Sequence, residues 1–197
     1  KRGPFSQDPV KVAAQWNADW ETVNLPHTWN AKDMQVKADA FYEGVGYYRK
    51  TQFFGNELKG KRVFLRFEGV GANTEVYVNG KLVGMHRGAY SAFAFEIGTA
   101  LKLGAENEIM VKADNASRSD VIPVNHNLFG VYGGIYRPVW LIITEQNNIT
   151  VTDCASPGVY ITQRNVSKRS ADITVKVKVS ASDGLYRIGI QKDGTGE

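Results

Sequence analysis

The residue types that most often carry hydrolytic or metal chemistry form no recognisable constellation in this chain. The three histidines, His27, His86 and His126, are far apart in sequence, and none lies in the sharp turn that presents a serine nucleophile. No His, Cys and carboxylate cluster has the spacing of a zinc site. We expect the single cysteine, Cys154, to be a small buried side chain rather than a nucleophile. The sequence therefore predicts no catalytic residue, no metal site and no cofactor within the chain.

Aromatic rings are the second group that could do chemistry, because a flat ring can stack on the apolar face of a sugar. We expect the tryptophans to lie in the core instead, since large aromatics dominate buried area. For Arg49 and Arg137, which lie among aromatic residues, we expect ion pairs or stacking on a ring rather than substrate contacts. The tryptophans are Trp16, Trp20, Trp29 and Trp140.

The elements that must position these residues are short strands. Apolar residues alternate with other side chains in five segments, and Asn79-Gly80 between two of them is a strong signal for a tight hairpin. Only Val10–Trp20 could form a turn or two of helix. The pattern predicts an all-β fold, a jelly-roll-like antiparallel sandwich. The predicted strands are Arg62–Phe67, Thr74–Val78 with its return Leu82-Val83, Phe93–Ile97, Ile109–Ala113 and Val139–Ile143.

Composition excludes two classes of partner. The 197 residues carry a net charge of +4 with no run of like charges, so we expect no nucleic-acid partner. No apolar run approaches the roughly 18 residues that a membrane span needs, so we expect no membrane partner. One connection, from Asp114 to Gly134, is unusually long and rich in aromatic residues. Long loops of this kind are usually functional or disordered, and the aromatic content argues against disorder.

A second unit is expected after a polar stretch near Thr144–Asn148. We therefore predict a first domain over 1–145 and a second over 146–197. The second unit holds three strand patterns, at Gly158–Thr162, Ala171–Val179 and Leu185–Ile190. Three strands cannot close a seven-stranded sandwich, so this unit is predicted to be incomplete and to expose an edge or find a partner.

Six motifs, in order over about 120 residues, together resemble the N-terminal domain of family 2 glycoside hydrolases, which include β-galactosidases, β-glucuronidases and β-mannosidases. The second unit resembles, more loosely, the start of the immunoglobulin-like domain of that family. The motifs are Trp20–Asn30 (WETVNLPHTWN), Gly46–Lys50 (GYYRK), Phe67–Val70 (FEGV) with Val76–Lys81 (VYVNGK), Gly88–Ile97, Gly104–Glu108 (GAENE) and Gly133–Leu141 (GGIYRPVWL).

The resemblance implies a retaining exo-β-glycosidase of the β-galactosidase type, whose acid and nucleophile are two carboxylates on a later catalytic barrel. The chain would be a non-catalytic region that buttresses this barrel. The family's general acid lies in an Asn-Glu pair. The two such pairs here, Asn56-Glu57 and Asn107-Glu108, fall in turns before predicted strands, so we interpret them as turn residues.

The resemblance also implies that a loop of this domain reaches the sugar. The corresponding residues are Asn125, His126 and Asn127, where Asn127 stands in place of an acidic residue of several members. An amide can still bond two hydroxyls, but it supplies no charge for a sodium ion. A second candidate rim, before the GYYRK strand, carries Asp39 and Glu43. The alternative for both loops is an ordinary surface loop.

Two other interpretations stay open from the sequence. The chain could be a free-standing carbohydrate-binding, lectin-like module, although the incomplete second unit argues against this. The incomplete unit could also pair strands with a second copy and give a homodimer. We expect a periplasmic or secreted protein, with a cytoplasmic one as the alternative.

Overall fold

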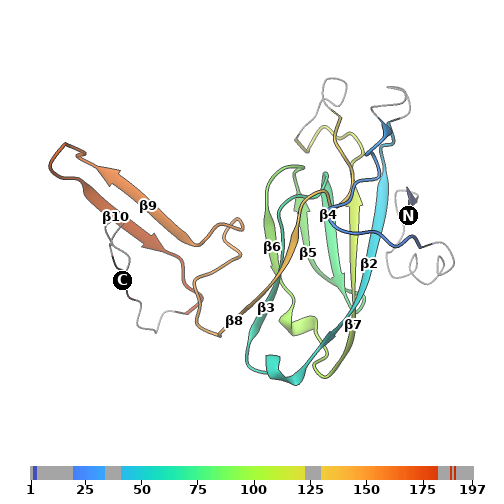
Figure 1. Ribbon diagram of the computed structural model, residues 1–197, viewed down its shortest axis with the longest axis horizontal. Coiled ribbons are helices and arrows are strands. Elements are labelled where there is room, and N and C mark those ends of the chain that lie inside the picture. The colour runs from blue at the N-terminus through green and yellow to red at the C-terminus, as the bar shows by residue number, and fades with distance from the viewer. Residues whose placement is uncertain are drawn as a thin grey trace.

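The computed structural model describes residues 2–3, 20–33, 41–122 and 130–181, together with residues 187 and 189. Nearly all of its regular structure is β-strand (Figure 1). The elements are β1 (Arg2–Gly3), β2 (Val45–Phe54), the 3-10 turn η2 (Asn56–Leu58), β3 (Arg62–Phe67), β4 (Asn73–Val78), β5 (Lys81–Arg87), β6 (Phe93–Glu96), the 3-10 turn η3 (Gly98–Ala100), β7 (Ala105–Asp114), β8 (Val139–Thr144), β9 (Val159–Arg164) and β10 (Asp172–Val177).

Two antiparallel sheets form a sandwich. The larger has the order β1-β2-β7-β4-β5 and the smaller the order β6-β3-β8. All pairings in them are antiparallel. Each strand sends every second side chain inward, so apolar residues at alternate positions meet between the sheets. The predicted β-sandwich is confirmed, and all the strands expected before Thr144 are present. The buried core comprises Phe54, Val63, Leu65, Phe67, Val70, Val76, Val78, Phe93, Ile97, Ile109, Val111, Ala113 and Ile135.

The Asn79-Gly80 turn joins β4 and β5 as the sequence predicts. Both residues have positive φ, 51° and 78°, which a two-residue hairpin turn of this kind requires. The Asn79 side chain donates to Asn107 Oδ1 at 2.7 Å and to the Ala100 carbonyl at 2.9 Å. Asn107 is fully buried and bonds the Lys102 backbone in both directions. The interpretation of the Asn107-Glu108 pair as structural rather than catalytic therefore has a geometric basis.

The outer face of the larger sheet carries a second cluster. Val45, Tyr47 and Met110 are buried there, and Trp20 packs against them. The Arg49 guanidinium lies 4.7 Å from the Trp20 ring centre. Arg137 lies similarly over the ring of its neighbour Tyr136, at 5.7 Å. Both arginines therefore stack on an aromatic ring, one of the two roles expected for them.

Two expectations about single residues are wrong. Trp140 is 55% exposed because it points outward from β8, the edge strand of the smaller sheet. Cys154 is exposed rather than buried, because it lies in the loop before β9 with a positive φ of 52°. Trp29, in contrast, packs against the core as expected. Trp16 and most of Val10–Trp20 lie outside the described residues.

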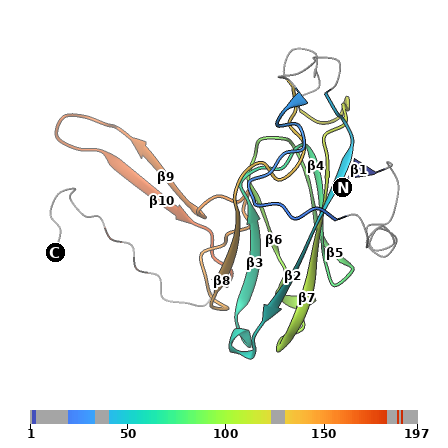
Figure 2. The ribbon, with the colours of Figure 1, turned by 45° about the vertical axis from the view of Figure 1, so that its right-hand side comes forward.

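After β8 the chain forms a separate two-stranded sheet of β9 and β10. Figures 1 and 2 show this hairpin projecting away from the sandwich. Its register pairs Val159 with Val177 and Ile161 with Val175 on one face, whereas the other face pairs Tyr160 with Lys176. The hairpin is thus amphipathic. Among the described residues, no strand covers its apolar face, and the predicted strand at Leu185–Ile190 lies largely outside them.

The Trp29 ring lies between two glycines, and this contact leads to a stability prediction. A Cβ added to Gly46 would lie 2.3 Å from Trp29 Cζ3, and one added to Gly133 would lie 2.0 Å from Trp29 Cζ2. With both sides blocked, the ring cannot move away. We expect Gly46→Ala to lower the free energy of unfolding by about 1–3 kcal/mol in urea denaturation. Gly98→Ala is the matched control, because its Cβ would meet nothing closer than 3.6 Å. Equal effects of the two substitutions would contradict the close packing.

Candidate functional site

Of the five residues predicted to contact a sugar, the structure describes only Glu43. Asn125, His126, Asn127 and Asp39 lie outside the described residues. Glu43 is exposed, and its Oε2 accepts a hydrogen bond from the Ser117 backbone N–H at 3.1 Å. What the structure does define is the framework from which both predicted loops begin and to which they return.

Both loops are rooted at the same end of the sandwich, where β2 begins and β7 ends, and we call this the loop end. Val45 and Asp114 are paired there. Figure 2 shows this end of β2 and β7 at the top. The first loop returns at Phe41 and the second before Tyr132. The rings of these two residues meet edge to face, with their centres 5.9 Å apart. The structure therefore brings together the bases of two loops that the sequence treats as separate.

Two buried asparagines and one half-buried aspartate hold the loop bases together, and we call them the amide network: Asn30, Asn115 and Asp33. Asn115 is 0% exposed. Its Oδ1 accepts from Gly44 N at 2.8 Å. Its Nδ2 donates to the Val131 carbonyl at 2.8 Å and to Asn30 Oδ1 at 3.2 Å. One side chain thus ties the base of the first loop to that of the second.

Asn30 completes the network from the other side. It is also 0% exposed, and its Oδ1 accepts from Gly133 N at 2.7 Å. Its Nδ2 donates to Asp33 Oδ2 at 2.7 Å and to the Tyr42 carbonyl at 2.9 Å. The same carboxylate oxygen accepts from Tyr42 N at 3.0 Å. Both amide ends of both asparagines are therefore satisfied, as buried polar groups require.

The sequence reasoning missed the amide network. Asn30 closes the Trp20–Asn30 motif, and Asn115 directly follows β7, but neither position signals burial by itself. Asn115 also begins an Asn-X-Ser sequon, with Ser117 as its third residue. Because the Asn115 side chain is fully enclosed, the folded chain cannot present it for glycosylation.

Beside the network, aromatic and titratable groups surround Trp29. The Tyr48 ring stacks on Trp29 at 6.5 Å, and its hydroxyl lies 2.9 Å from His27 Nδ1. Burial raises the pKa of Tyr48 to about 12, so its hydroxyl stays protonated. Burial also lowers the pKa of His27, although nearby Glu21 opposes this. Neutral His27 can therefore accept a hydrogen bond from the Tyr48 hydroxyl at Nδ1.

A pocket of roughly 680 Å³ opens along this group. Its walls combine flat aromatic faces with charged and hydrogen-bonding side chains, a combination that suits a polar ligand with apolar faces. The lining comprises Trp20, Glu21, Thr22, Val23, His27, Thr28, Trp29, Ala31, Lys32, Asp33, Gly46, Tyr47, Tyr48 and Arg49.

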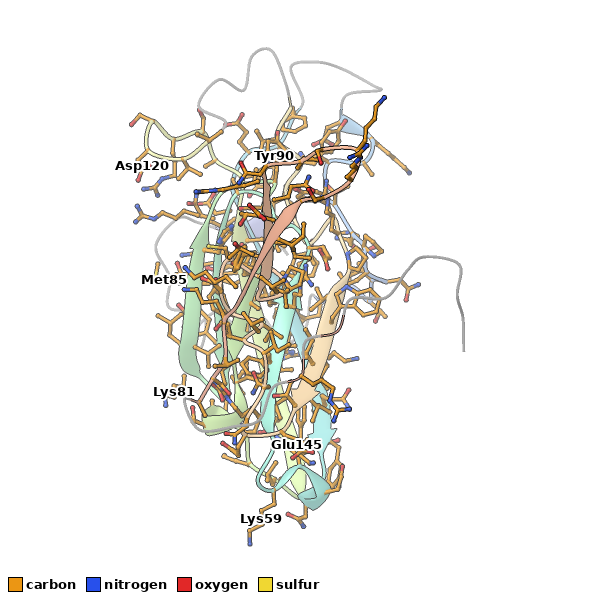
Figure 3. All side chains as sticks on the ribbon, turned by 90° about the vertical axis from the view of Figure 1, so that its left-hand side faces the viewer. Lys59, Lys81, Met85, Tyr90, Asp120 and Glu145 are labelled. Carbon is orange, nitrogen blue, oxygen red and sulfur yellow. The ribbon has the colours of Figure 1, made fainter. Side chains whose placement is uncertain are left out.

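Charge at the loop end is concentrated around Asp120, which Figure 3 places at the same end as Tyr90 and opposite Lys59. Arg118 Nε donates to Asp120 Oδ1 at 2.8 Å, and Arg87 approaches the other oxygen at 3.2 Å. The Arg118 hydrogen bond lowers the pKa of Asp120. All three side chains are exposed, so this cluster adds little stability. Among the described residues, no group of three or more His, Cys, Asp or Glu side chains could hold a metal ion.

The amide network predicts a large loss of stability when Asn115 is truncated. Asn115→Ala leaves Gly44 N–H and the Val131 carbonyl buried without a partner, so we expect the free energy of unfolding to fall by about 2–4 kcal/mol. Asn56→Ala, on the exposed η2 turn, is the control and should change it by about 0.5 kcal/mol or less. Urea denaturation of both variants checks this. A loss at Asn115 no larger than the control's would argue against the network.

The lowered pKa of His27 predicts a pH dependence of stability. Burial lowers the pKa of His86 as well. Since the folded-state values lie below the ordinary 6.5, the unfolded chain binds protons first as the pH falls through about 6.5. We expect the free energy of unfolding to decrease between pH 7.5 and 5.5. Glu75 and Glu96, whose pKa values are also lowered, change the free energy of unfolding only below about pH 4.5.

Denaturation at several pH values tests this dependence on the parent chain and on a His27→Gln, His86→Gln double variant. The decrease should be smaller in the double variant. An unchanged slope would mean that other groups cause it.

Among the described residues, no helix is long and apolar enough to cross a membrane. Comparison with known proteins gives several relatives. A β-glucuronidase from Bacteroides fragilis is 43% identical over 188 residues, which cover 94% of this chain and 27% of that protein. A β-galactosidase from Thermoanaerobacter pseudethanolicus is 33% identical and covers 84% of this chain and 22% of the relative. The chain therefore spans 22–27% of the length of these two relatives.

Solved structures agree. A Bacteroides fragilis protein, named provisionally as a β-galactosidase, is 78% identical with a TM-score of 0.85, covering 91% of this chain and 27% of that one. A Bacteroides uniformis β-glucuronidase is 36% identical with a TM-score of 0.76, covering 81% of this chain and 19% of that one. Residues 5–145 match the family model described as glycosyl hydrolases family 2, sugar binding domain. The chain belongs to glycoside hydrolase family 2 and carries the N-terminal sugar-binding domain of that family.

Proposed function

We propose that this chain is the non-catalytic N-terminal region of a retaining exo-β-glycosidase, and that it buttresses a catalytic barrel and lends loops to the sugar site. The observation that carries the proposal is the match of residues 5–145 to the sugar-binding domain, within a chain that covers only 27% of a β-glucuronidase relative. The remaining length of such relatives leaves room for the barrel. We further propose that residues 146–197 begin an immunoglobulin-like domain, which the separate β9–β10 sheet supports.

Two carboxylates, Glu75 and Glu96, support a non-catalytic role for the described part of the chain. A general acid for glycoside hydrolysis needs a raised pKa. Burial alone would raise the pKa of Glu75, but hydrogen bonds from Lys112, at 2.7 Å, and from Tyr77 outweigh it and lower the value. A bidentate pair with Arg62, at 2.6 and 2.9 Å, lowers the pKa of Glu96. These two groups are structural anions whose oxygens are already engaged.

The loop end supports a role in sugar binding. Carbohydrate sites combine aromatic faces with amides and carboxylates that bond hydroxyls. Here the amide network holds two loop bases together. Glu43 is exposed beside them and accepts a hydrogen bond from the Ser117 backbone N–H. The predicted contacts Asn125, His126, Asn127 and Asp39 belong to the loops rooted there. We propose a β-galactoside as the substrate of the full-length enzyme, with a β-glucuronide as the alternative that the relatives' names supply.

Hydrolysis of chromogenic β-glycosides tests the proposal. The isolated chain should show no turnover of a β-galactoside, β-glucuronide, β-mannoside or β-glucoside, because in this proposal the acid and the nucleophile belong to the barrel. The full-length protein should hydrolyse one of them, and which one identifies the sugar. Turnover by the isolated chain that a matching inhibitor abolishes would refute the non-catalytic assignment. Inactivity of the full-length protein on the whole panel would refute the glycosidase proposal.

A further inference from the structure

Tyr132 is an exposed ring in a stretch of backbone that is otherwise buried. It is 42% exposed, whereas Val131 on one side is 1% exposed. On the other side Gly133 and Gly134 are buried and Ile135 is 2% exposed. The fold therefore presents one large ring to solvent at the loop end while it encloses the residues around that ring.

The backbone on both sides of Tyr132 is fixed. The amide network bonds the Val131 carbonyl at 2.8 Å and the Gly133 N–H at 2.7 Å. Gly71 also approaches closely, since a Cβ added there would lie 2.2 Å from the Tyr132 carbonyl oxygen. A tyrosine on a fixed backbone has only two side-chain torsions left to order, so it loses little conformational freedom when it binds a ligand.

A second ring, from the base of the other loop, supports Tyr132. The Phe41 and Tyr132 rings meet edge to face, at an interplanar angle of 83° with their centres 5.9 Å apart. The residue after Phe41 is held by the same amide network. Tyr42 N–H donates to Asp33 Oδ2 at 3.0 Å, and its carbonyl accepts from Asn115 Nδ2 at 3.2 Å. One network thus positions both rings of the pair.

This support distinguishes Tyr132 from the other exposed aromatic residues. Single exposed apolar side chains are common on protein surfaces and need no explanation. Within the described ranges, however, Tyr132 is the only exposed aromatic residue that packs against a second ring. A fixed, exposed ring suits a ligand with a flat apolar face, such as a sugar or an aromatic ring. The other exposed aromatic residues are Phe53, Tyr90, Trp140 and Tyr160.

The position of the ring pair in the chain indicates which part of a substrate it meets. Asp39 and Glu43, two of the predicted sugar contacts, are each two residues from Phe41, and Asn127 is five residues before Tyr132. An exo-acting glycosidase encloses the one sugar that it removes, and the rest of the substrate extends toward solvent. A ring that is 42% exposed belongs to an open rim rather than to an enclosed pocket. The pair therefore fits the part of the substrate that leaves.

We propose that the ring pair of Tyr132 and Phe41 receives the leaving group of a β-glycoside, a second sugar or an aromatic ring, each of which has a flat apolar face. Tyr132 stacks on the leaving group, and Phe41 holds the Tyr132 ring in place. The inference rests on the proposed function and adds a binding role for two residues that the sequence analysis did not single out.

Inhibition constants for a matched pair of ligands test this role on the full-length protein. The ligands are the phenyl and the methyl 1-thio-β-glycosides of the sugar that the chromogenic panel identifies, which differ only in the group at the leaving position. Tyr132→Ala should weaken inhibition by the phenyl compound roughly threefold to tenfold and leave inhibition by the methyl compound unchanged. Tyr132→Phe keeps the ring and should retain both constants of the parent protein.

Tyr90→Ala is the control for the loss of an exposed ring. Tyr90 is 52% exposed, and Figure 3 places it at the same end of the sandwich as Asp120. This variant should change neither constant. If Tyr132→Ala weakens both ligands equally, the ring serves packing, and if it weakens neither, the ring does not meet the ligand. Either result overturns the inference while hydrolysis by the parent protein upholds the proposed function. A parent protein that hydrolyses nothing on the panel refutes the proposed function itself, and this inference with it.

Discussion

The structure depends on the packing of a five-stranded sheet against a three-stranded one. A sheet is stabilised by burying one face, and the wider sheet here has more inward surface than the narrower one can cover. The two sides of the sandwich differ in how this excess inward surface is covered. At β5 and β6 aromatic stacking closes the gap, whereas Leu141 and Ile143 on β8 stay half exposed. The outer face of the wide sheet needs its own cover, which Trp20 and Arg49 provide in part.

The same constraint explains why a buried amide network lies at the loop end. Where the strands stop, the backbone of the connecting loops loses its ladder partners, and each buried N–H or C=O needs a substitute. Asn115 and Asn30 supply both donors and acceptors, so both amide ends of both asparagines are paired where four chain segments meet. An aspartate at either position could accept but not donate. The chemistry of an amide, rather than its charge, suits this junction.

Local periodicity was sufficient to predict the sandwich, because alternation with a period of two is set by each strand on its own. The hairpin at Asn79-Gly80 followed from backbone conformation alone. The amide network could not be predicted in this way, since Asn30 and Asn115 become buried only when distant segments meet. The prediction that Trp140 is buried was wrong for a related reason. Its residue type favours burial, but its outward orientation on an edge strand decides its exposure. Four of the five predicted sugar contacts lie in loops whose sequence carries no comparable periodic signal, and those predictions stay open.

The distribution of charge shows how a scaffold and a catalytic site can be divided between parts of one enzyme. A catalytic acid must keep a proton at working pH, which requires burial without a cation beside it. Two partly buried carboxylates of this chain do the opposite, because Lys112 and Arg62 hold Glu75 and Glu96 in the charged form. Such pairs fix strand register across a sheet and leave no proton to donate. In the function we propose, such a domain orients a sugar, and the reaction takes place on carboxylates elsewhere in the protein. The division is chemically economical, since a carboxylate that a neighbouring cation holds in the charged form cannot serve as the general acid.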